Sequence, residues 1–244
     1  MKVIGVIPVR YHSSRFEGKA LADIHGKPMI ERVYRQAVKS LFVNKTIVAT
    51  DDERIFQVVM KFGGEVVMTS ADNKTGTDRI AESVINIETD LVVNIQGDEP
   101  LLSPEVIDSV IQPLLDDSKL QMATAASEIK NEQELDNPDI VKVTMDHQGY
   151  ALYFSRSRIP YQAKNQEIHS PSYKHLGLYS YRKDFLIRFT GLPQSSLEKA
   201  ERLEQLRVLE NGYKIKIIKV KYDGVGVDTK EDLEKVIQLL KHTD

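Results

Sequence analysis

Short runs rich in Val and Ile alternate with amphipathic helical patterns through the first half of the chain. The runs predict β-strands at Val3–Pro8, Lys45–Thr50, Glu65–Thr69 and Leu91–Ile95. The intervening patterns predict helices at Pro28–Ser40, Asp52–Phe62, Thr77–Ile87 and Pro104–Asp116. Strands that alternate with helices at this spacing form a mostly parallel sheet with helices on both faces. We therefore expect an α/β fold with a Rossmann-like sheet.

The second half of the chain has a different pattern. Val141–Asp146 and Tyr150–Ser155 flank a His-Gln-Gly turn and predict a hairpin, and His175–Tyr181 alternates apolar and polar residues as a further strand does. These strands predict an antiparallel extension of the sheet, approximately residues 130–190, that offers a surface for a second copy of the chain. We expect a homodimer.

The last third of the chain returns to helical patterns. Ser196–Asn211 predicts one helix that ends at Asn-Gly, Tyr213–Val220 predicts a strand, and Lys230–Leu240 predicts a final helix capped by Asp228 or Thr229. The sequence contains neither a repeat nor a linker. We expect residues 1–244 to form a single domain.

Composition excludes several classes of protein. The chain has no Cys, which rules out disulfides, thiolate zinc sites, iron–sulfur clusters and a Cys nucleophile. Lys and Arg total 33 against 36 Asp and Glu, a balance that argues against a general nucleic-acid surface. The apolar run at the N-terminus is too short for a signal peptide, and no stretch approaches the ~20 apolar residues of a membrane span. We expect a cytoplasmic protein with no membrane insertion.

Three cations lie within ten residues on the loop after the first predicted strand. Arg10, Arg15 and Lys19 are suited to the oxygens of a triphosphate, because Arg offers a forked pair of donors and Lys a point charge. No Walker motif is present, since Gly18-Lys19 is followed by Ala20. The alternative is a solvated loop with ordinary cations. The position after the first strand, where ligands of open α/β sheets bind, favours the phosphate interpretation.

A carboxylate follows the fourth predicted strand. Asp98, next to Gly97, is placed as a Mg²⁺ ligand would be, because Mg²⁺ takes one or two carboxylates together with substrate phosphate oxygens. An Asp that only turns the chain before Pro100 is an equal alternative. Asp228 has the same ambiguity, since Asp is a common helix N-cap. A metal role for Asp228 requires a fold that brings it beside Asp98.

Two further regions have both a binding and a structural interpretation. Thr75–Arg79 offers small side chains and backbone N–H groups at a helix start, suited to a base edge or a phosphate, although an ordinary capped helix has the same pattern. His175 could contact an acidic substrate, although a lone His on a strand is more often structural. The histidines have no H-x-x-x-H spacing, so zinc hydrolysis has no support.

Taken together, the motifs of the chain resemble those of the cytidylyltransferases that activate 3-deoxy-manno-octulosonate (Kdo). The first-half motifs, which many sugar nucleotidyltransferases share, are Ile7-Pro8-Val9-Arg10-Tyr11, Ser14-Arg15, Gly18-Lys19, Gly26-Lys27-Pro28-Met29-Ile30, Val48-Ala49-Thr50-Asp51, Gly76-Thr77-Asp78-Arg79 and Asn94-Ile95-Gln96-Gly97-Asp98-Glu99-Pro100. The more diagnostic second-half motifs are Tyr150-Ala151-Leu152-Tyr153-Phe154-Ser155-Arg156, Lys174-His175-Leu176-Gly177, Leu203-Glu204-Gln205-Leu206-Arg207 and Gly226-Val227-Asp228-Thr229. The resemblance runs nearly end to end.

The resemblance implies a Mg²⁺-dependent reaction of CTP with Kdo that gives CMP-Kdo, a building block of lipopolysaccharide, and pyrophosphate. It implies that the nucleotide is bound by Arg10, Arg15, Lys19, Gly76, Thr77, Arg79 and Gln96, and the sugar acid by Arg156, His175, Tyr179, Glu204 and Gln205. Asp98 and Asp228 would bind the metal and, with Arg10 and Lys19, form the catalytic set. In-line attack on the α-phosphorus needs positioning and charge neutralisation, and a substrate carboxylate would explain Arg156 and His175 as anion partners.

The phosphate loop departs from the family pattern, which usually has Pro where Glu17 and Ala20 stand here. The loss of both prolines predicts a less pre-organised loop, with CTP affinity affected more than activity. Two other functions are compatible with the residues: a glycosyltransferase of similar fold, although the D-x-D motif common in that class is missing at Asp98-Glu99-Pro100, and a non-catalytic nucleotide sensor. The retained cations and carboxylates argue against a sensor.

Overall fold

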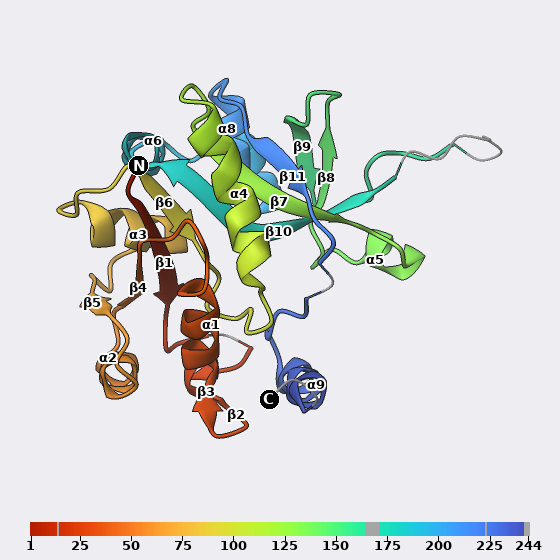
Figure 1. Cartoon of the computed structure of the whole chain (residues 1–244). Coiled ribbons are helices and arrows are strands. Elements are labelled where there is room, and N and C mark those ends of the chain that lie inside the picture. The colour runs from red at the N-terminus through yellow and green to blue at the C-terminus, as the bar shows by residue number, and fades with distance from the viewer. Residues whose placement is uncertain (14, 164–170, 223, 242–244) are drawn as a thin grey trace.

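A nine-stranded sheet forms the centre of the molecule (Figure 1). The structure is a computed structural model, and it describes residues 1–13, 15–163, 171–222 and 224–241. Along the main path of the sheet the strands are β11 (Lys216–Lys219), β7 (Met122–Glu128), β10 (Tyr173–Arg182), β6 (Leu91–Asn94), β1 (Val3–Val9), β4 (Lys45–Thr50) and β5 (Val66–Met68). The buried Val and Ile residues of β1, β4 and β6 account for their central positions.

Most neighbouring strands on this path run in parallel, as the sequence predicts. β6, β1, β4 and β5 are parallel to one another, and β11 is parallel to β7. β10 runs antiparallel to both of its neighbours, β6 and β7. The predicted hairpin is confirmed as β8 (Lys142–Met145) and β9 (Ala151–Ser155), and β8 joins the sheet through β10. The antiparallel extension is therefore present.

Helices cover both faces of the sheet (Figure 1). On one face α1 (Met29–Ala37), α2 (Glu53–Lys61) and α4 (Pro104–Asp116) enclose the larger apolar core. On the other face α3 (Gly76–Val84), α6 (Lys183–Thr190) and α8 (Gln205–Glu210) enclose the second core. The remaining helices are the 3₁₀ turn η1 (Lys19–Leu21), α5 (Glu132–Asp136), α7 (Ser196–Glu201) and α9 (Lys230–Leu240).

The single helix predicted over residues 196–211 is wrong. Two short helices, α7 and α8, occupy this stretch, and Arg202 between them adopts a left-handed conformation with φ 54°. The break is held by a buried ion pair in which the Arg207 guanidinium donates to the Glu198 carboxylate at 2.8 and 2.5 Å. This tertiary contact overrides the continuous helical pattern and turns residues 203–205 toward the end of the sheet.

A third, small apolar core fixes the C-terminal helix. The hairpin of β2 (Asp23–Ile24) and β3 (Lys27–Pro28) lies beside α9 in Figure 1. Ile24 and Met29 pack there with Val227, Val236 and Leu240. The segment just before α9 is thereby held close to the loop that follows β1. None of the described helices is both long and apolar enough to cross a membrane.

Candidate active site

A cavity of about 560 Å³ opens at the carboxyl ends of β1 and β6, where ligands of open α/β sheets bind. Its walls come from the loop after each of these strands, the start of α3, the middle of β10, the α7–α8 connection and the segment before α9. The predicted site residues that line it are Arg10, Gly76, Thr77, Arg79, Gln96, Asp98, His175, Tyr179, Glu204, Gln205 and Asp228. Residues from distant parts of the sequence thus meet in one place.

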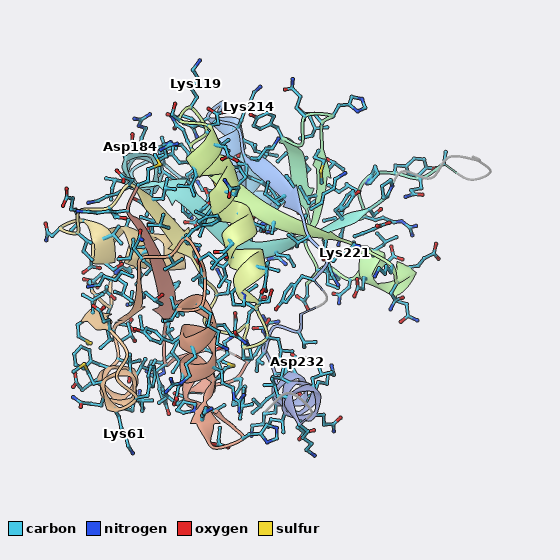
Figure 2. The ribbon with its side chains drawn as sticks, viewed as in Figure 1. Lys61, Lys119, Asp184, Lys214, Lys221 and Asp232 are labelled. Atoms are coloured by element: carbon cyan, nitrogen blue, oxygen red, sulfur yellow. The ribbon has the colours of Figure 1, made fainter. Side chains whose placement is uncertain are left out.

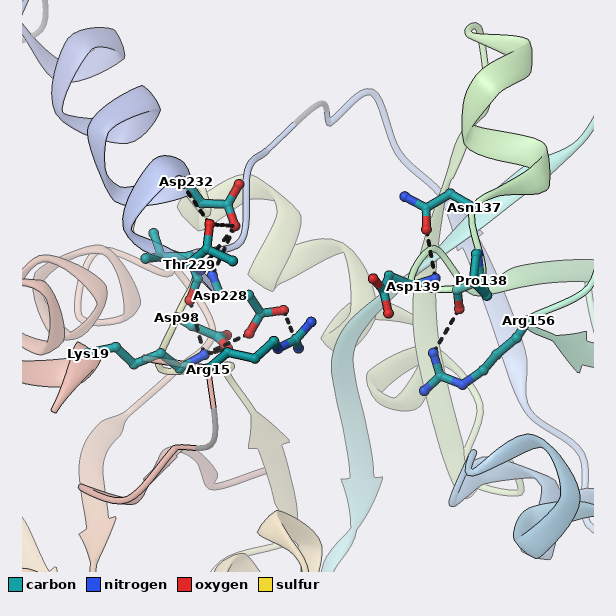
Figure 3. Close-up of polar contacts among 11 residues, drawn as sticks. Arg15, Lys19, Asp98, Asn137, Pro138, Asp139, Arg156, Asp228, Thr229 and Asp232 are labelled. Atoms are coloured by element: carbon teal, nitrogen blue, oxygen red, sulfur yellow. Dashed lines mark hydrogen bonds and ion pairs between the residues drawn. The ribbon is translucent and has the colours of Figure 1, made fainter. Parts of the chain in front are cut away.

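Lys19 links the two predicted metal ligands at the rim of this cavity (Figure 3). Its ammonium lies 2.6 Å from Asp98 Oδ2 and 3.0 Å from Asp228 Oδ1, and it also donates to the Val227 carbonyl at 3.0 Å. Arg15 donates to the other oxygen of Asp228 at 2.8 Å. Burial lowers the pKa of Lys19, but the two carboxylates outweigh that effect and the net pKa is raised. The ammonium therefore stays charged.

Asp228 is free of the capping role that its position suggested. Thr229 is the N-cap of α9, and its hydroxyl and the Asp232 carboxylate form a reciprocal capping box. The Asp228 side chain therefore points away from the helix toward Lys19 and Arg15 (Figure 3). A metal role for Asp228 requires a fold that brings it beside Asp98, and both carboxylates do contact the same Lys19 ammonium.

The donor set at this point fits a magnesium ion. Among the described residues no group of three or more His, Asp or Glu side chains is arranged to enclose a metal. Mg²⁺ does not require such a cage, because it takes one or two carboxylates and completes its shell with water and phosphate oxygens. Asp98 and Asp228 already converge on a single cationic group, the Lys19 ammonium. The two carboxylates are the residues that would hold the ion.

The loop that carries these cations packs on Tyr11, at its start. Gly18 has φ 69°, a conformation that suits glycine, and a Cβ there would lie only 3.1 Å from the Tyr11 ring. The Gly18 amide donates to the Tyr11 carbonyl at 2.8 Å, and the Arg54 guanidinium stacks 3.2 Å from the Tyr11 ring centroid. Tyr11 thus contacts the loop through both its carbonyl and its ring. Ser14 lies outside the described residues, and Glu17 contacts the exposed His12.

Arg10 and Arg79 have different surroundings. The Arg10 side chain is exposed, with its guanidinium donating to the Asn73 carbonyl at 2.5 Å, so it remains accessible to an anion. Arg79 is fully buried, and its guanidinium donates to Asp51 at 2.7 Å and to the Thr69 hydroxyl. Among the described residues, its Nε has no hydrogen-bond partner. Arg79 therefore lines the cavity from a buried position with its guanidinium held by Asp51 and Thr69, and its predicted nucleotide contact stays a prediction.

The deep wall of the cavity is aromatic and uncharged. The rings of His175 and Tyr179 lie 5.2 Å apart on β10, and burial lowers the pKa of His175 to about 3 and raises the pKa of Tyr179. The Thr124 hydroxyl is 3.0 Å from His175 Nε2. His175 is therefore neutral near pH 7, and its predicted contact with the substrate carboxylate stays a prediction. It is available only as a neutral hydrogen-bonding group.

Three polar side chains complete the wall. Glu204 accepts a 2.5 Å hydrogen bond from the Thr77 hydroxyl, and burial raises the pKa of its carboxyl. Gln96 donates to the Gly177 carbonyl at 2.8 Å and to Asn94 at 3.2 Å, which orients its amide. Gln205 is 5% exposed, at the first turn of α8. The break between α7 and α8 places both Glu204 and Gln205 on the cavity.

Arg156 is the predicted sugar ligand that the structure does not bring to this cavity. It is absent from the lining residues, and its guanidinium donates to the carbonyls of Glu201 and Pro138, each at 2.9 Å. Figure 3 shows the contact with Pro138. Its own carbonyl accepts from the buried Lys142 ammonium. Arg156 here joins β9 to α7 and to the loop before β8. A contact with the sugar acid stays a prediction.

Glu99 is a cavity residue that the sequence reasoning passed over. It follows Asp98 and lines the same cavity, and its carboxylate accepts a 3.1 Å hydrogen bond from the Tyr222 hydroxyl. Burial and the neighbouring Asp98 raise the pKa of Glu99 to about 7. The sequence does contain a signal for Glu99, because it is a second acidic residue directly after a candidate metal ligand.

Comparisons with known proteins agree with this geometry. A cytidylyltransferase family model matches residues 4–217. The 3-deoxy-manno-octulosonate cytidylyltransferase of Geotalea uraniireducens is 50% identical over 99% of this chain and 100% of its own length. The enzyme of the same name from Geobacter sulfurreducens is 48% identical, with 99% and 100% coverage.

Solved structures support the same assignment. A CMP:2-keto-3-deoxy-manno-octonic acid synthetase complexed with CTP matches with a TM-score of 0.94 and 43% identity, covering 99% of each chain. A 4-diphosphocytidyl-2C-methyl-D-erythritol synthase from Anaerococcus prevotii has a TM-score of 0.66 at 15% identity, which shows a shared fold alone. The match in sequence and structure extends over the whole length of the chain, and the chain belongs to the 3-deoxy-manno-octulosonate cytidylyltransferase family.

Proposed function

We propose that this protein joins CTP and Kdo to give CMP-Kdo and pyrophosphate, and that the product supplies lipopolysaccharide synthesis. The observation that carries the proposal is the cluster of Lys19, Asp98 and Asp228 at the rim of the cavity, in a chain 50% identical to a Kdo cytidylyltransferase. Cations and carboxylates side by side are what transfer of a nucleotidyl group requires, because the reaction is catalysed by positioning and charge neutralisation.

The nucleotide would enter along the loop after β1. Arg10, Arg15 and Lys19 supply three cations for the triphosphate, and the backbone N–H groups at Gly76 and Thr77 begin α3. Two of these cations, Arg15 and Lys19, are paired with carboxylates in this structure. They must therefore exchange at least part of that pairing for phosphate oxygens when CTP binds.

The reaction joins the anomeric oxygen of the sugar acid to the α-phosphorus and breaks the bond from that phosphorus to the pyrophosphate oxygen, and the proton of the anomeric hydroxyl leaves to solvent. Asp98 and Asp228 would hold Mg²⁺, which when bound neutralises phosphate charge and polarises the attacking hydroxyl. Lys19 and Arg10 would stabilise the charge on the departing pyrophosphate. The neutral imidazole of His175 and the polar side chains of Glu204 and Gln205 would orient the sugar hydroxyls.

Pyrophosphate release tests this function. We expect release only when the protein, Mg²⁺, CTP and Kdo are all present, and none when sialic acid replaces Kdo. Asp98→Asn should lower kcat by at least about 100-fold, because a metal ligand is lost. Asp184→Asn, on an exposed side chain at the start of α6 (Figure 2), should leave kcat unchanged. Absence of release from the intact protein with Kdo would refute the proposal.

We further propose that the protein is a cytoplasmic homodimer. Two apolar or aromatic side chains near the antiparallel extension are exposed, Leu152 at 62% and Tyr161 at 86%, and a second copy of the chain would cover them. Light scattering at the assay concentration is the test. A dimer mass is expected, and a monomer mass would remove this part of the proposal.

A further inference from the structure

The two carboxylates of the site belong to chain segments more than a hundred residues apart. Asp98 lies on the loop after β6, and Asp228 lies just before α9. The described hydrogen bonds that join these segments directly are few. The Val227 amide donates to the Asp98 carbonyl at 2.8 Å, Lys19 bridges both carboxylates, and the Tyr222 hydroxyl donates to Glu99 at 3.1 Å.

Lys19 cannot keep both carboxylates together throughout the reaction proposed above. Its ammonium is a cation for the triphosphate, so CTP binding draws it from Asp98 and Asp228. The carboxylates of Asp98 and Asp228 then face the same cavity, beside Glu99, and repel each other. Among the described residues, the Val227–Asp98 and Tyr222–Glu99 hydrogen bonds are the direct polar links that do not depend on Lys19, and Leu101 packs with Val225 and Val227 in the small apolar core.

The chain around Tyr222 is shaped to hold this contact. The Tyr222 ring packs against the larger apolar core, and burial raises the pKa of its hydroxyl, which therefore stays a donor. Gly224 leaves the room that the ring occupies, since a Cβ at this position would lie 1.9 Å from two atoms of the Tyr222 ring and hydroxyl. A residue with a side chain at 224 would displace the ring from Glu99.

We infer that Tyr222 is a positioning residue, whose ring has the space it needs because residue 224 is glycine. It holds the loop of Asp98 and Glu99 against the segment of Asp228. The two metal-binding carboxylates thereby keep their spacing when Lys19 binds CTP instead of them. Tyr222 acts through Glu99 and the loop and touches no substrate. Hydrogen bonds behind metal ligands fix the ligand geometry, and their loss typically costs 10–100-fold in metal affinity or activity. The inference rests on the proposed function and names the residue that supports its metal site.

The experiment measures how much Mg²⁺ strengthens CTP binding, by calorimetry without a sugar acid. The CTP dissociation constant is measured once with EDTA and once with saturating Mg²⁺, and the ratio of the two gives the metal-dependent gain. Tyr222→Phe should reduce this gain about tenfold and leave the EDTA value within about twofold. Gly224→Ala should act in the same direction.

Tyr34→Phe is the matched control. Tyr34 is also half-buried, and its hydroxyl accepts a hydrogen bond from the Glu65 amide at 3.1 Å, away from the carboxylates. Tyr34→Phe should keep the full metal-dependent gain in CTP affinity, although it should lose about as much thermal stability as Tyr222→Phe. In turnover, Tyr222→Phe should lower kcat with little change in the sugar KM.

Two results would overturn the inference: a full metal-dependent gain in Tyr222→Phe, or no metal-dependent gain in the unsubstituted protein. Neither depends on Kdo being the substrate, because the calorimetric cell holds no sugar acid. Failure of the proposed function appears separately, as absence of pyrophosphate release.

Discussion

Replacing Lys19 by Met removes the ammonium between two carboxylates and keeps most of the apolar stem. The lost contacts are two charge-assisted hydrogen bonds, of 2.6 and 3.0 Å, and a third to a carbonyl at 3.0 Å. The Lys19 side chain is 17% exposed, but those of Asp98 and Asp228 are 30% and 45% exposed, so water offsets part of the loss. We expect the free energy of unfolding to fall by about 2–3 kcal/mol. For a chain of this size that is a loss of about 5–10 °C in Tm.

The same substitution should make the protein respond more strongly to magnesium. With Lys19 gone, Asp98 and Asp228 repel each other, and a divalent cation relieves that repulsion. A ligand at 100 times its Kd stabilises the native state by about 2.7 kcal/mol, which would restore most of the loss. Thermal unfolding in EDTA and in saturating Mg²⁺ measures both effects. Lys61→Met, on an exposed side chain that projects from α2 (Figure 2), is the control. A Mg²⁺ shift no larger in Lys19→Met than in the control would refute the reasoning.

Two further predictions concern the cavity wall and the loop. His175 binds a proton with a pKa of about 3 when folded against 6.5 ordinarily, so the unfolded chain takes up more protons and stability falls as the pH drops below 6.5. Between pH 8 and pH 5 this group should lower the free energy of unfolding by about 2 kcal/mol. Chemical denaturation at the two pH values should show that this loss is missing in His175→Gln and present in His147→Gln, an exposed control. Arg54→Ala removes the guanidinium stacked on Tyr11 and should raise the CTP KM about 2–5-fold with kcat unchanged, whereas an equal KM would contradict the role given to this stacking.

The parallel part of the fold was predictable because its signals are local. The strands ending near Arg10 and Asn94 are rich in Val, Ile and Leu, and the rule that ligands bind at the carboxyl ends of such strands placed Asp98 correctly on a cavity wall. β7 was not predicted. Its sequence Met122–Glu128 consists largely of small residues, with Thr124 as its single β-branched side chain and no aromatic one. Its buried position between β10 and β11 makes it a strand.

The parts of the site that were not predictable depend on tertiary contacts. The turn that brings Glu204 to the cavity exists because Arg207 pairs with Glu198 across the break at Arg202, and no local propensity signals that pairing. The neutrality of His175 results from burial, which the sequence of one strand does not reveal. The link from Tyr222 to Glu99 spans more than a hundred residues. Each of these is a long-range effect of the completed fold.

The position of β10 has a consequence for how the chain must be made. β10 is synthesised after residue 172, yet it lies in the middle of the sheet between β6 and β7, and it contributes His175, Gly177 and Tyr179 to the cavity. A nascent chain emerging from the ribosome can assemble β1, β4, β5 and β6, but β6 keeps an open edge until β10 arrives. A fragment that ends anywhere between β7 and β10 would lack part of the cavity wall. It would also expose the edge of β6, whose unpaired backbone groups favour aggregation. Closure of this sheet, and with it of the cavity, therefore requires the chain to extend through β10.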